Sequence, residues 1–166
     1  MRILGVDPGY AIAGYGVIRY EAGRFAVLDY GAATTPAKTD FSYRLELIYD
    51  QISLVMKKWK PDALSIEQLF FTTNATTAIG VAEARGVILL AAKQNNIPVF
   101  EYTPLQVKSA VVGYGKAVKA QVMEMTRIIL GLSQVPKPDD TADALAIAIC
   151  HAHCNGSLMS KLKGRY

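Results

Sequence analysis

The feature that most constrains the fold is a short apolar run that ends at a carboxylate, because it occurs twice. Residues 3–6 (Ile-Leu-Gly-Val) are followed by Asp7, and residues 63–66 (Ala-Leu-Ser-Ile) are followed by Glu67. Runs of this kind predict buried strands, and functional groups gather outside the carboxyl ends of strands in an open α/β sheet. Glu67 is hard to explain otherwise, because Glu is disfavoured in strands. We therefore expect an α/β sheet with both acids at strand ends.

The remaining periodicity supplies the other strands and the helices. Further strands are expected over residues 14–20, 24–34 and 98–102, and helices over residues 41–60, 76–95, 104–112, 119–130 and 140–154. The first three strands should form an antiparallel meander, and the later strands alternate with helices. This order predicts one α/β domain over residues 1–155, built on a mixed five-stranded sheet with helices on both faces. Residues 156–166 form a basic tail.

Composition excludes several classes of protein. Apolar residues make up 51% of the chain, so disorder is excluded, and the net charge of +4 permits a polyanionic partner without requiring one. The longest apolar stretch, near residues 86–92, is too short to span a bilayer, and no signal peptide is expected before the first strand. Cys150 and Cys154 fit reduced thiols, because two cysteines make no disulfide framework. We expect a soluble, cytoplasmic protein.

Two more carboxylates, Asp140 and Asp143, lie three residues apart and would share one face of a helix. Each acid also has a structural explanation. Asp140 could cap the helix with Asp143 as its third-position partner, and Asp7 could be a turn residue. These explanations must all hold separately, whereas one metal site accounts for the whole set.

A cluster of four carboxylates implies a particular chemistry. Such acids raise one another's pKa unless a cation neutralises them, and hard oxygen ligands favour Mg²⁺ or Mn²⁺. Two such ions can activate a water molecule and stabilise the leaving oxygen of a phosphodiester. The pattern therefore makes metal-assisted phosphodiester hydrolysis a candidate activity.

Short motifs run in a fixed order from the first strand to about residue 153. They are Gly-Val-Asp-Pro-Gly (5–9), Gly-Tyr-Gly-Val (14–17), Ile-Glu-Gln-Leu-Phe (66–70), Ala-Arg-Gly-Val (84–87), Val-Phe-Glu-Tyr (99–102), Gln-Val-Lys (106–108), Val-Val-Gly (111–113) and Asp-Thr-Ala-Asp-Ala-Leu-Ala (140–146). Together they resemble the RuvC family of Holliday-junction resolvases. The resemblance implies an RNase H-like fold in which Asp7, Glu67, Asp140 and Asp143 bind the catalytic Mg²⁺ ions. Two ions per subunit are implied, with Mn²⁺ also supporting activity.

The same resemblance implies partners. It implies a homodimer that cuts two opposed strands of a four-way DNA junction during recombination and repair, with a RuvA–RuvB branch-migration complex as a further partner. The alanine-rich helix over residues 76–95 is similar to the dimerisation helix of the family, although one apolar face would pack on its own sheet in any case. Asp139 could share the role of Asp140, but the three-residue spacing to Asp143 favours Asp140.

Aromatic and basic residues near the acids are candidates for DNA contacts. Phe70 matches a family aromatic that stacks on a base at the crossover, while Phe71 remains open because one of the two rings should complete the core. Lys108 matches a basic position near the scissile phosphate and could also steady the attacking water. Lys119 also matches a basic family position near the scissile phosphate. It could be an ordinary solvated charge, but a cation near a helix start gains nothing from the helix dipole, which favours a functional role. Lys116, in a flexible loop, could bind DNA or be an ordinary surface charge.

Other functions are also compatible with parts of the sequence. A sugar kinase or ATPase of the actin type would need a second domain and a second phosphate loop, for which 166 residues leave no room. Residues 66–68 and 140–143 argue against a related nuclease that acts on ribosomal RNA precursors, and the presence of all four acids argues against a junction-binding protein without catalysis. Cleavage assays separate these alternatives. We reject a zinc site at His151, His153 and Cys154, because residues two apart do not share a helix face, and we assign Cys150 to the core.

Overall fold

The structure of the chain is a computed structural model that describes residues 1–69 and 75–156. Its strands are β1 (Arg2–Asp7), β2 (Ile12–Glu21), β3 (Arg24–Thr34), β4 (Ala63–Glu67) and β5 (Val99–Tyr102). Its helices are α1 (Phe41–Trp59), α2 (Ala75–Gln94), α3 (Pro104–Val112), α4 (Lys119–Ile129) and α5 (Asp139–Gly156). Every strand and helix that we expected from the sequence is present.

The strands form one mixed sheet in the order β3-β2-β1-β4-β5. The first three strands pair as an antiparallel meander, whereas β1, β4 and β5 are parallel. The predicted topology is therefore confirmed. In the register of the two central strands, Val6 lies opposite Ile66, so the next residues, Asp7 and Glu67, leave the sheet side by side.

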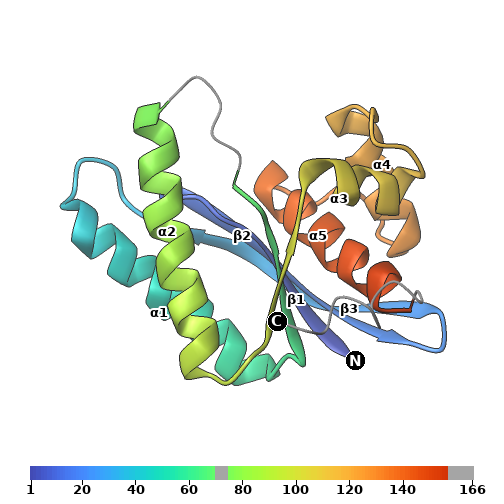
Figure 1. Cartoon of the computed structure of the whole chain (residues 1–166), viewed down its shortest axis with the longest axis horizontal. Coiled ribbons are helices and arrows are strands. Elements are labelled where there is room, and N and C mark those ends of the chain that lie inside the picture. Colours follow the sequence, from blue (N-terminus) through green and yellow to red (C-terminus); the bar gives the residue numbers. More distant parts are fainter. Residues whose placement is uncertain (70–74, 157–166) are drawn as a thin grey trace.

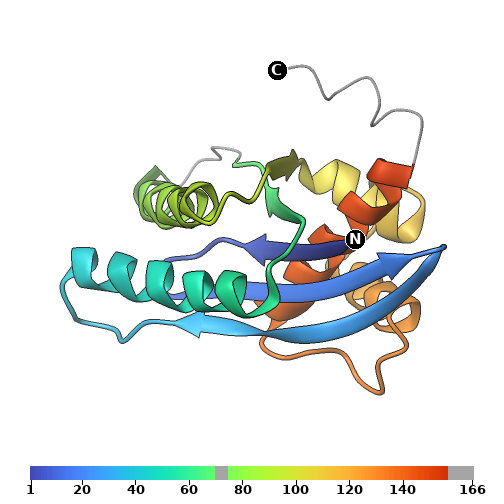
Figure 2. The same cartoon turned by 90° about the horizontal axis from the view of Figure 1, so that it is seen from below.

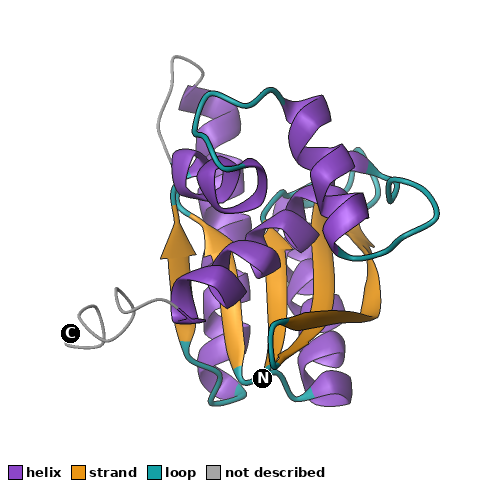
Figure 3. Cartoon of the chain, turned by 90° about the vertical axis from the view of Figure 1, so that its right-hand side faces the viewer, coloured by secondary structure: helices purple, strands orange, loops and turns teal. Residues whose placement is uncertain are grey.

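Helices cover both faces of the sheet (Figure 3). Helices α1 and α2 pack side by side on one face, and α5 lies on the other face with α3 and α4 beyond it (Figure 1, Figure 2). Strand β1 alternates between the two sides, because Ile3 belongs to the apolar core under α5 and Leu4 and Val6 belong to the core under α1 and α2. All three side chains are fully buried.

Two glycines let α5 lie unusually close to the sheet. A Cβ atom on Gly5 would lie 2.0 Å from the main-chain oxygen of Ala144, and one on Gly14 would lie 2.0 Å from that of Asp140. Gly14 is also the register partner of Asp7. The close approach therefore brings the start of α5, with Asp140, against the strand end that carries Asp7.

Element boundaries differ from the sequence-based expectation by a few residues. Strand β2 begins at Ile12, because Ile12 already pairs with Thr34 on β3. Helix α1 ends at Trp59, and Lys60 follows in the left-handed conformation (φ 45°) with its N–H donating to the oxygen of Met56. Helix α5 begins one residue early at Asp139. Among the helices of the described chain, none is both long and apolar enough to cross a membrane.

Candidate active site

Three elements deliver the four predicted acids to one end of the sheet. Asp7 ends β1 and Glu67 ends the neighbouring parallel strand β4. Asp140 and Asp143 lie in the first turns of α5, which the glycine contacts hold against β1 and β2. Asp140 follows the first residue of the helix rather than preceding it, so it does not occupy the N-cap position that the structural explanation assigned to it.

The acids act on one another electrostatically. The pKa of Asp7 is raised to about 8, first by burial and then by the charge of Asp143. Glu67 and Asp140 raise it further, while Lys119 acts in the opposite direction. A carboxylic acid keeps a proton at neutral pH only where burial and like charges make the anion costly. The structure therefore brings Asp7 close enough to the other three acids for their charges to interact.

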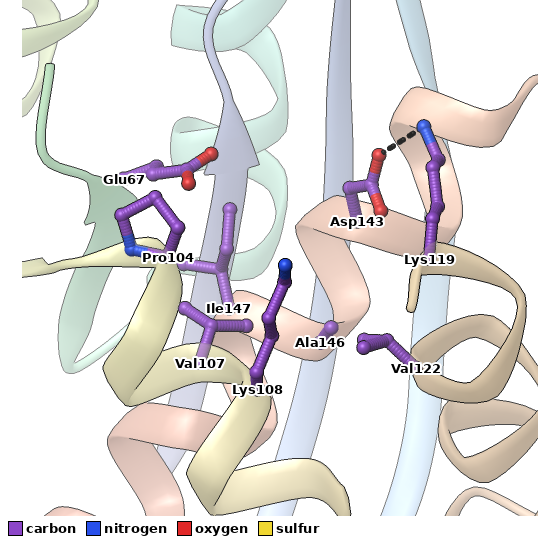
Figure 4. A pocket seen from close by; sticks show the side chains of 9 residues that line it. All are labelled: Glu67, Pro104, Val107, Lys108, Lys119, Val122, Asp143, Ala146 and Ile147. Carbon is purple, nitrogen blue, oxygen red and sulfur yellow. Dashed lines mark ion pairs between the residues drawn. The ribbon is translucent and has the colours of Figure 1, made fainter. Parts of the chain in front are cut away.

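Glu67 and Asp143 face each other across a hollow of about 160 Å³ (Figure 4). Its walls are apolar and come from Pro104, Val107, Val122, Ala146 and Ile147. Lys108 extends from α3 into the space between the two acids. Burial, and after it the charge of Asp143, raises the pKa of Glu67, whereas Lys108 lowers it. The hollow thus combines two acids and an amine in a partly desolvated setting, where electrostatic interactions are strong.

Lys119 neutralises part of this charge. Its amine lies 2.8 Å from a carboxylate oxygen of Asp143 and 4.0 Å from one of Asp139. Asp139 is bound more closely by Lys137, at 2.6 Å, and its side chain is 45% exposed. Asp139 does not contribute to the raised pKa of Asp7, whereas Asp140 does. These contacts favour Asp140 over Asp139 as the fourth acid of the site.

The donor set suits a hard divalent cation. It consists of carboxylates alone. The pKa of Asp7 is raised first by burial and then by the negative charge of the neighbouring acids, which a cation would compensate. Within residues 1–69 and 75–156, however, no group of three or more acidic, His or Cys side chains is close enough together to hold an ion. In this conformation Asp143 is bound to Lys119 instead. The acids have the chemistry of a metal site, but their carboxylates would have to move closer together to bind an ion.

Comparisons with known proteins identify the family. A family model described as crossover junction endodeoxyribonuclease RuvC matches residues 3–151. The chain belongs to the RuvC family. A relative in Clostridioides difficile (strain 630), named crossover junction endodeoxyribonuclease RuvC, is 55% identical over 100% of this chain and 99% of its own length. RuvC proteins are metal-dependent nucleases, in agreement with the acidic donor set.

Solved RuvC structures share the fold. The structure of Thermus thermophilus RuvC is 35% identical in sequence, with a TM-score of 0.87 over 94% of this chain and 96% of that one. The same protein in complex with Holliday junction substrate is 36% identical, with a TM-score of 0.88 over 92% of this chain and 93% of that one. The RNase H-like fold expected from the RuvC resemblance is therefore confirmed.

The structure bears differently on the other residues singled out in the sequence, which were the candidates for DNA contacts and the residues considered for zinc. Lys116 is exposed in the turn between α3 and α4, which agrees with its predicted place in a loop. Phe70 and Phe71 lie outside the described residues, so their roles remain predictions. Cys150 is fully buried, which confirms its assignment to the core. His151 is also buried, and its Nδ1 atom is 2.8 Å from the hydroxyl of Tyr102.

Sequence reasoning gave no role to Arg85, although the residue contacts the site. Its Nε atom donates a hydrogen bond to the main-chain oxygen of Glu67 at 3.3 Å, and its side chain is only 13% exposed. The available signal was a cation in the middle of an alanine-rich helix, where a buried charge is costly unless it is paired. Its partner, Glu101, is distant in sequence and could not be assigned without the fold.

Proposed function

We propose that this chain is a Holliday-junction resolvase, which hydrolyses one phosphodiester bond in each of two opposed strands of a four-way DNA junction. The observation that carries the proposal is that Asp7, Glu67, Asp140 and Asp143 lie at the same end of the sheet, with the pKa of Asp7 raised to about 8 by burial and by the other three acids. The substrate follows from family membership and from the Thermus thermophilus relative, whose complex contains Holliday junction substrate.

The four acids have one task in the proposed reaction, which is to hold divalent cations. Mg²⁺, two ions per subunit, is the preferred occupant, and Mn²⁺ should also support activity. When bound, these ions activate water and stabilise charge on the phosphate oxygens. The hollow between Glu67 and Asp143 holds the reacting phosphate, and its apolar walls exclude bulk water.

The lysines around the hollow act on the phosphate. Lys108 points into the hollow, so its amine can contact a phosphate oxygen or steady the attacking water. Lys119 is paired with Asp143 in this structure, and its amine would be free to contact the DNA backbone if Asp143 held a cation instead. Lys116 is exposed in the turn beyond α3 and adds a contact to the DNA backbone.

The proposed homodimer forms through α2. This helix is apolar on two faces: Ala84, Ile88 and Ala91 are buried against the core, whereas Ile79 is 58% and Leu90 is 50% exposed. A two-fold dimer suits a junction arranged with two-fold symmetry, because it presents two related sites to two related strands. We further propose the bacterial cytoplasm as the location and a RuvA–RuvB complex as a partner, on the strength of family membership.

Charges placed on the exposed face of α2 should separate the dimer. Ile79→Glu combined with Leu90→Glu is expected to weaken dimerisation by at least about 100-fold, because the new carboxylates would be buried without partners. Sedimentation equilibrium measures this change. The matched control is Ile128→Glu, whose parent side chain is 55% exposed on α4. Equal masses for the double variant and the control would remove α2 from the interface.

Phe70→Ala should lower junction cleavage by about 10- to 100-fold while changing the unfolding temperature little, because stacking on a base contributes about 1–3 kcal/mol. Single-turnover cleavage and thermal unfolding of the same preparation measure the two effects. Phe71→Ala is the matched variant, and we expect its stability to fall more than its activity. A thermal defect without a specific loss of cleavage in Phe70→Ala would place that ring in the core.

The coordinated cut is tested with a supercoiled plasmid that extrudes a cruciform. Two cuts within the lifetime of one complex give linear plasmid, whereas independent cuts give nicked circles. We expect linear plasmid as the first product of the wild type, and nicked circles from the α2 double variant. Nicked circles from the wild type would contradict a paired cut by a dimer.

A further inference from the structure

Arg85 joins the helix of the proposed dimer interface to the main chain of Glu67. It lies on α2, and its guanidinium reaches two other elements. Its Nε atom donates to the oxygen of Glu67, at the end of β4, at 3.3 Å. Its Nη2 atom lies 2.7 Å from a carboxylate oxygen of Glu101 on β5, at ion-pair distance but without the geometry of a hydrogen bond.

The Glu101 contact fixes the guanidinium in place. Glu101 lies on β5 and is the register partner of Ile66, the residue before Glu67 on β4. The ion pair therefore joins α2 to the strand next to β4. The Arg85 side chain is 13% exposed, and a buried guanidinium without an anion would be strongly destabilising. Arg85 is therefore held close to the main chain at Glu67 rather than being free to turn into solvent.

The main chain at Glu67 is also held from the other side. The N–H of the next residue, Gln68, donates to the oxygen of Tyr102 at 2.8 Å. The peptide unit between Glu67 and Gln68 thus has both polar groups bound, the oxygen by Arg85 and the N–H by β5. Fixing this peptide fixes the direction in which the Glu67 side chain leaves the sheet.

The influence of Arg85 runs through the main chain rather than through charge. Arg85 binds the peptide oxygen of Glu67, and its charge is matched by Glu101. Loss of Arg85 should therefore displace the Glu67 carboxylate by freeing the peptide oxygen that Arg85 binds.

We propose that Arg85, held by Glu101, is a positioning residue that orients the Glu67 carboxylate for cation binding and ties that orientation to the position of α2. The inference rests on the proposed function, because it assigns Glu67 to the metal site. The competing interpretation is that the Arg85–Glu101 pair only stabilises the fold. The two interpretations differ in which measured quantities change.

The test uses Arg85→Gln, Arg85→Lys and Glu101→Gln in the full chain. Arg85→Gln should lower kcat for junction cleavage by about 100-fold, because a small displacement of a reacting group has an effect of that size. Mn²⁺ binding measured by calorimetry without DNA should weaken by about 10- to 100-fold. KM, junction binding in EDTA and the shape of the pH–rate profile should remain those of the wild type. Arg85→Lys should recover part of the loss, since an ammonium can pair with Glu101.

A matched control and a second variant keep the test decisive. Lys58→Gln breaks an ion pair with Asp29 of 2.9 Å at a distance from the site, and it should leave kcat and Mn²⁺ affinity unchanged. If Arg85→Gln does not fold, Arg85→Lys carries the test, because it retains a cation opposite Glu101, lacks the guanidinium Nε donor to Glu67, and should give a smaller loss of the same kind. Wild-type kcat and Mn²⁺ affinity in the folded variants would overturn the proposal. Losses of kcat and Mn²⁺ affinity that only parallel equal losses of stability and of junction binding would also overturn it. Mn²⁺ binding is informative even if the wild type fails to cut junctions.

Discussion

Asp7→Asn is expected to abolish junction cleavage and, in the absence of metal, to stabilise the folded protein. Loss of a metal-binding carboxylate should lower the cleavage rate by roughly 1,000-fold or more. Junction binding in EDTA should survive, because DNA affinity depends mainly on cations that contact phosphates. Single-turnover cleavage and a gel-shift assay measure the two properties. Normal turnover in the variant would remove Asp7 from the site.

The stability gain follows from the raised pKa of Asp7, which is about 8 in the folded chain against an ordinary value of 3.8. The folded state holds this proton more tightly than the unfolded state, so ionisation destabilises the fold. The penalty is absent below the unfolded pKa, grows as pH rises from 3.8, and is complete above about 8. At roughly 1.4 kcal/mol per pKa unit, reduced by partial exposure, it amounts to a few kcal/mol.

Thermal unfolding in EDTA at pH 5 and pH 9 measures this penalty. Asp7→Asn should unfold at a higher temperature than the wild type, and the difference should be larger at pH 9. Asp29→Asn is the matched control, because Asp29 accepts a 2.7 Å hydrogen bond from the Trp59 indole and pairs with Lys58. That variant should be destabilised and fully active. The same difference between Asp7→Asn and the wild type at both pH values would contradict the burial of an uncompensated carboxylate.

Asp140→Asn and Asp139→Asn should differ sharply although the two residues are adjacent. Asp140 contributes to the raised pKa of Asp7, and its main chain lies against Gly14 beside that acid. Its loss should lower the cleavage rate by at least about 100-fold. Asp139 is bound to Lys137 at 2.6 Å and is half-exposed, so its loss should change the rate by less than about threefold, as for an exposed ion pair.

Rates at saturating Mg²⁺ and the Mg²⁺ concentration for half-maximal rate measure this difference. A loss in Asp139→Asn equal to that in Asp140→Asn would mean that both acids serve the site. The reverse order would assign the fourth position to Asp139. Lys137→Gln is a useful companion, because it releases Asp139 without removing a carboxylate and should leave the rate unchanged.

The sequence predicted the sheet and the positions of the acids because the relevant signals are local. Asp7 and Glu67 each follow a buried strand directly, and the Asp140–Asp143 spacing lies within one helix. Parallel pairing of β1 and β4 then brings the strand ends together. Element order was therefore sufficient to predict which end of the sheet carries the candidate site.

Contacts between distant segments could not be predicted in the same way. The close approach of Asp140 to Gly14 depends on how deeply α5 packs on the sheet, and no local pattern specifies that depth. The pairing of Lys119 with Asp143 joins two helices, and it accounts for a cation near a helix start that gains nothing from the helix dipole. Arg85 was visible as an isolated cation, but its link to Glu67 required the fold.

The most direct test of the central claim is incubation of the purified protein with a labelled synthetic four-way junction and, separately, with the matching linear duplex. Each substrate is tested with Mg²⁺, with Mn²⁺ and with EDTA. Paired, symmetric nicks in opposed strands of the junction, dependent on the metal and absent from the duplex, are the predicted result. Tight binding without nicks under every condition, or equal cutting of junction and duplex, would contradict a Holliday-junction resolvase.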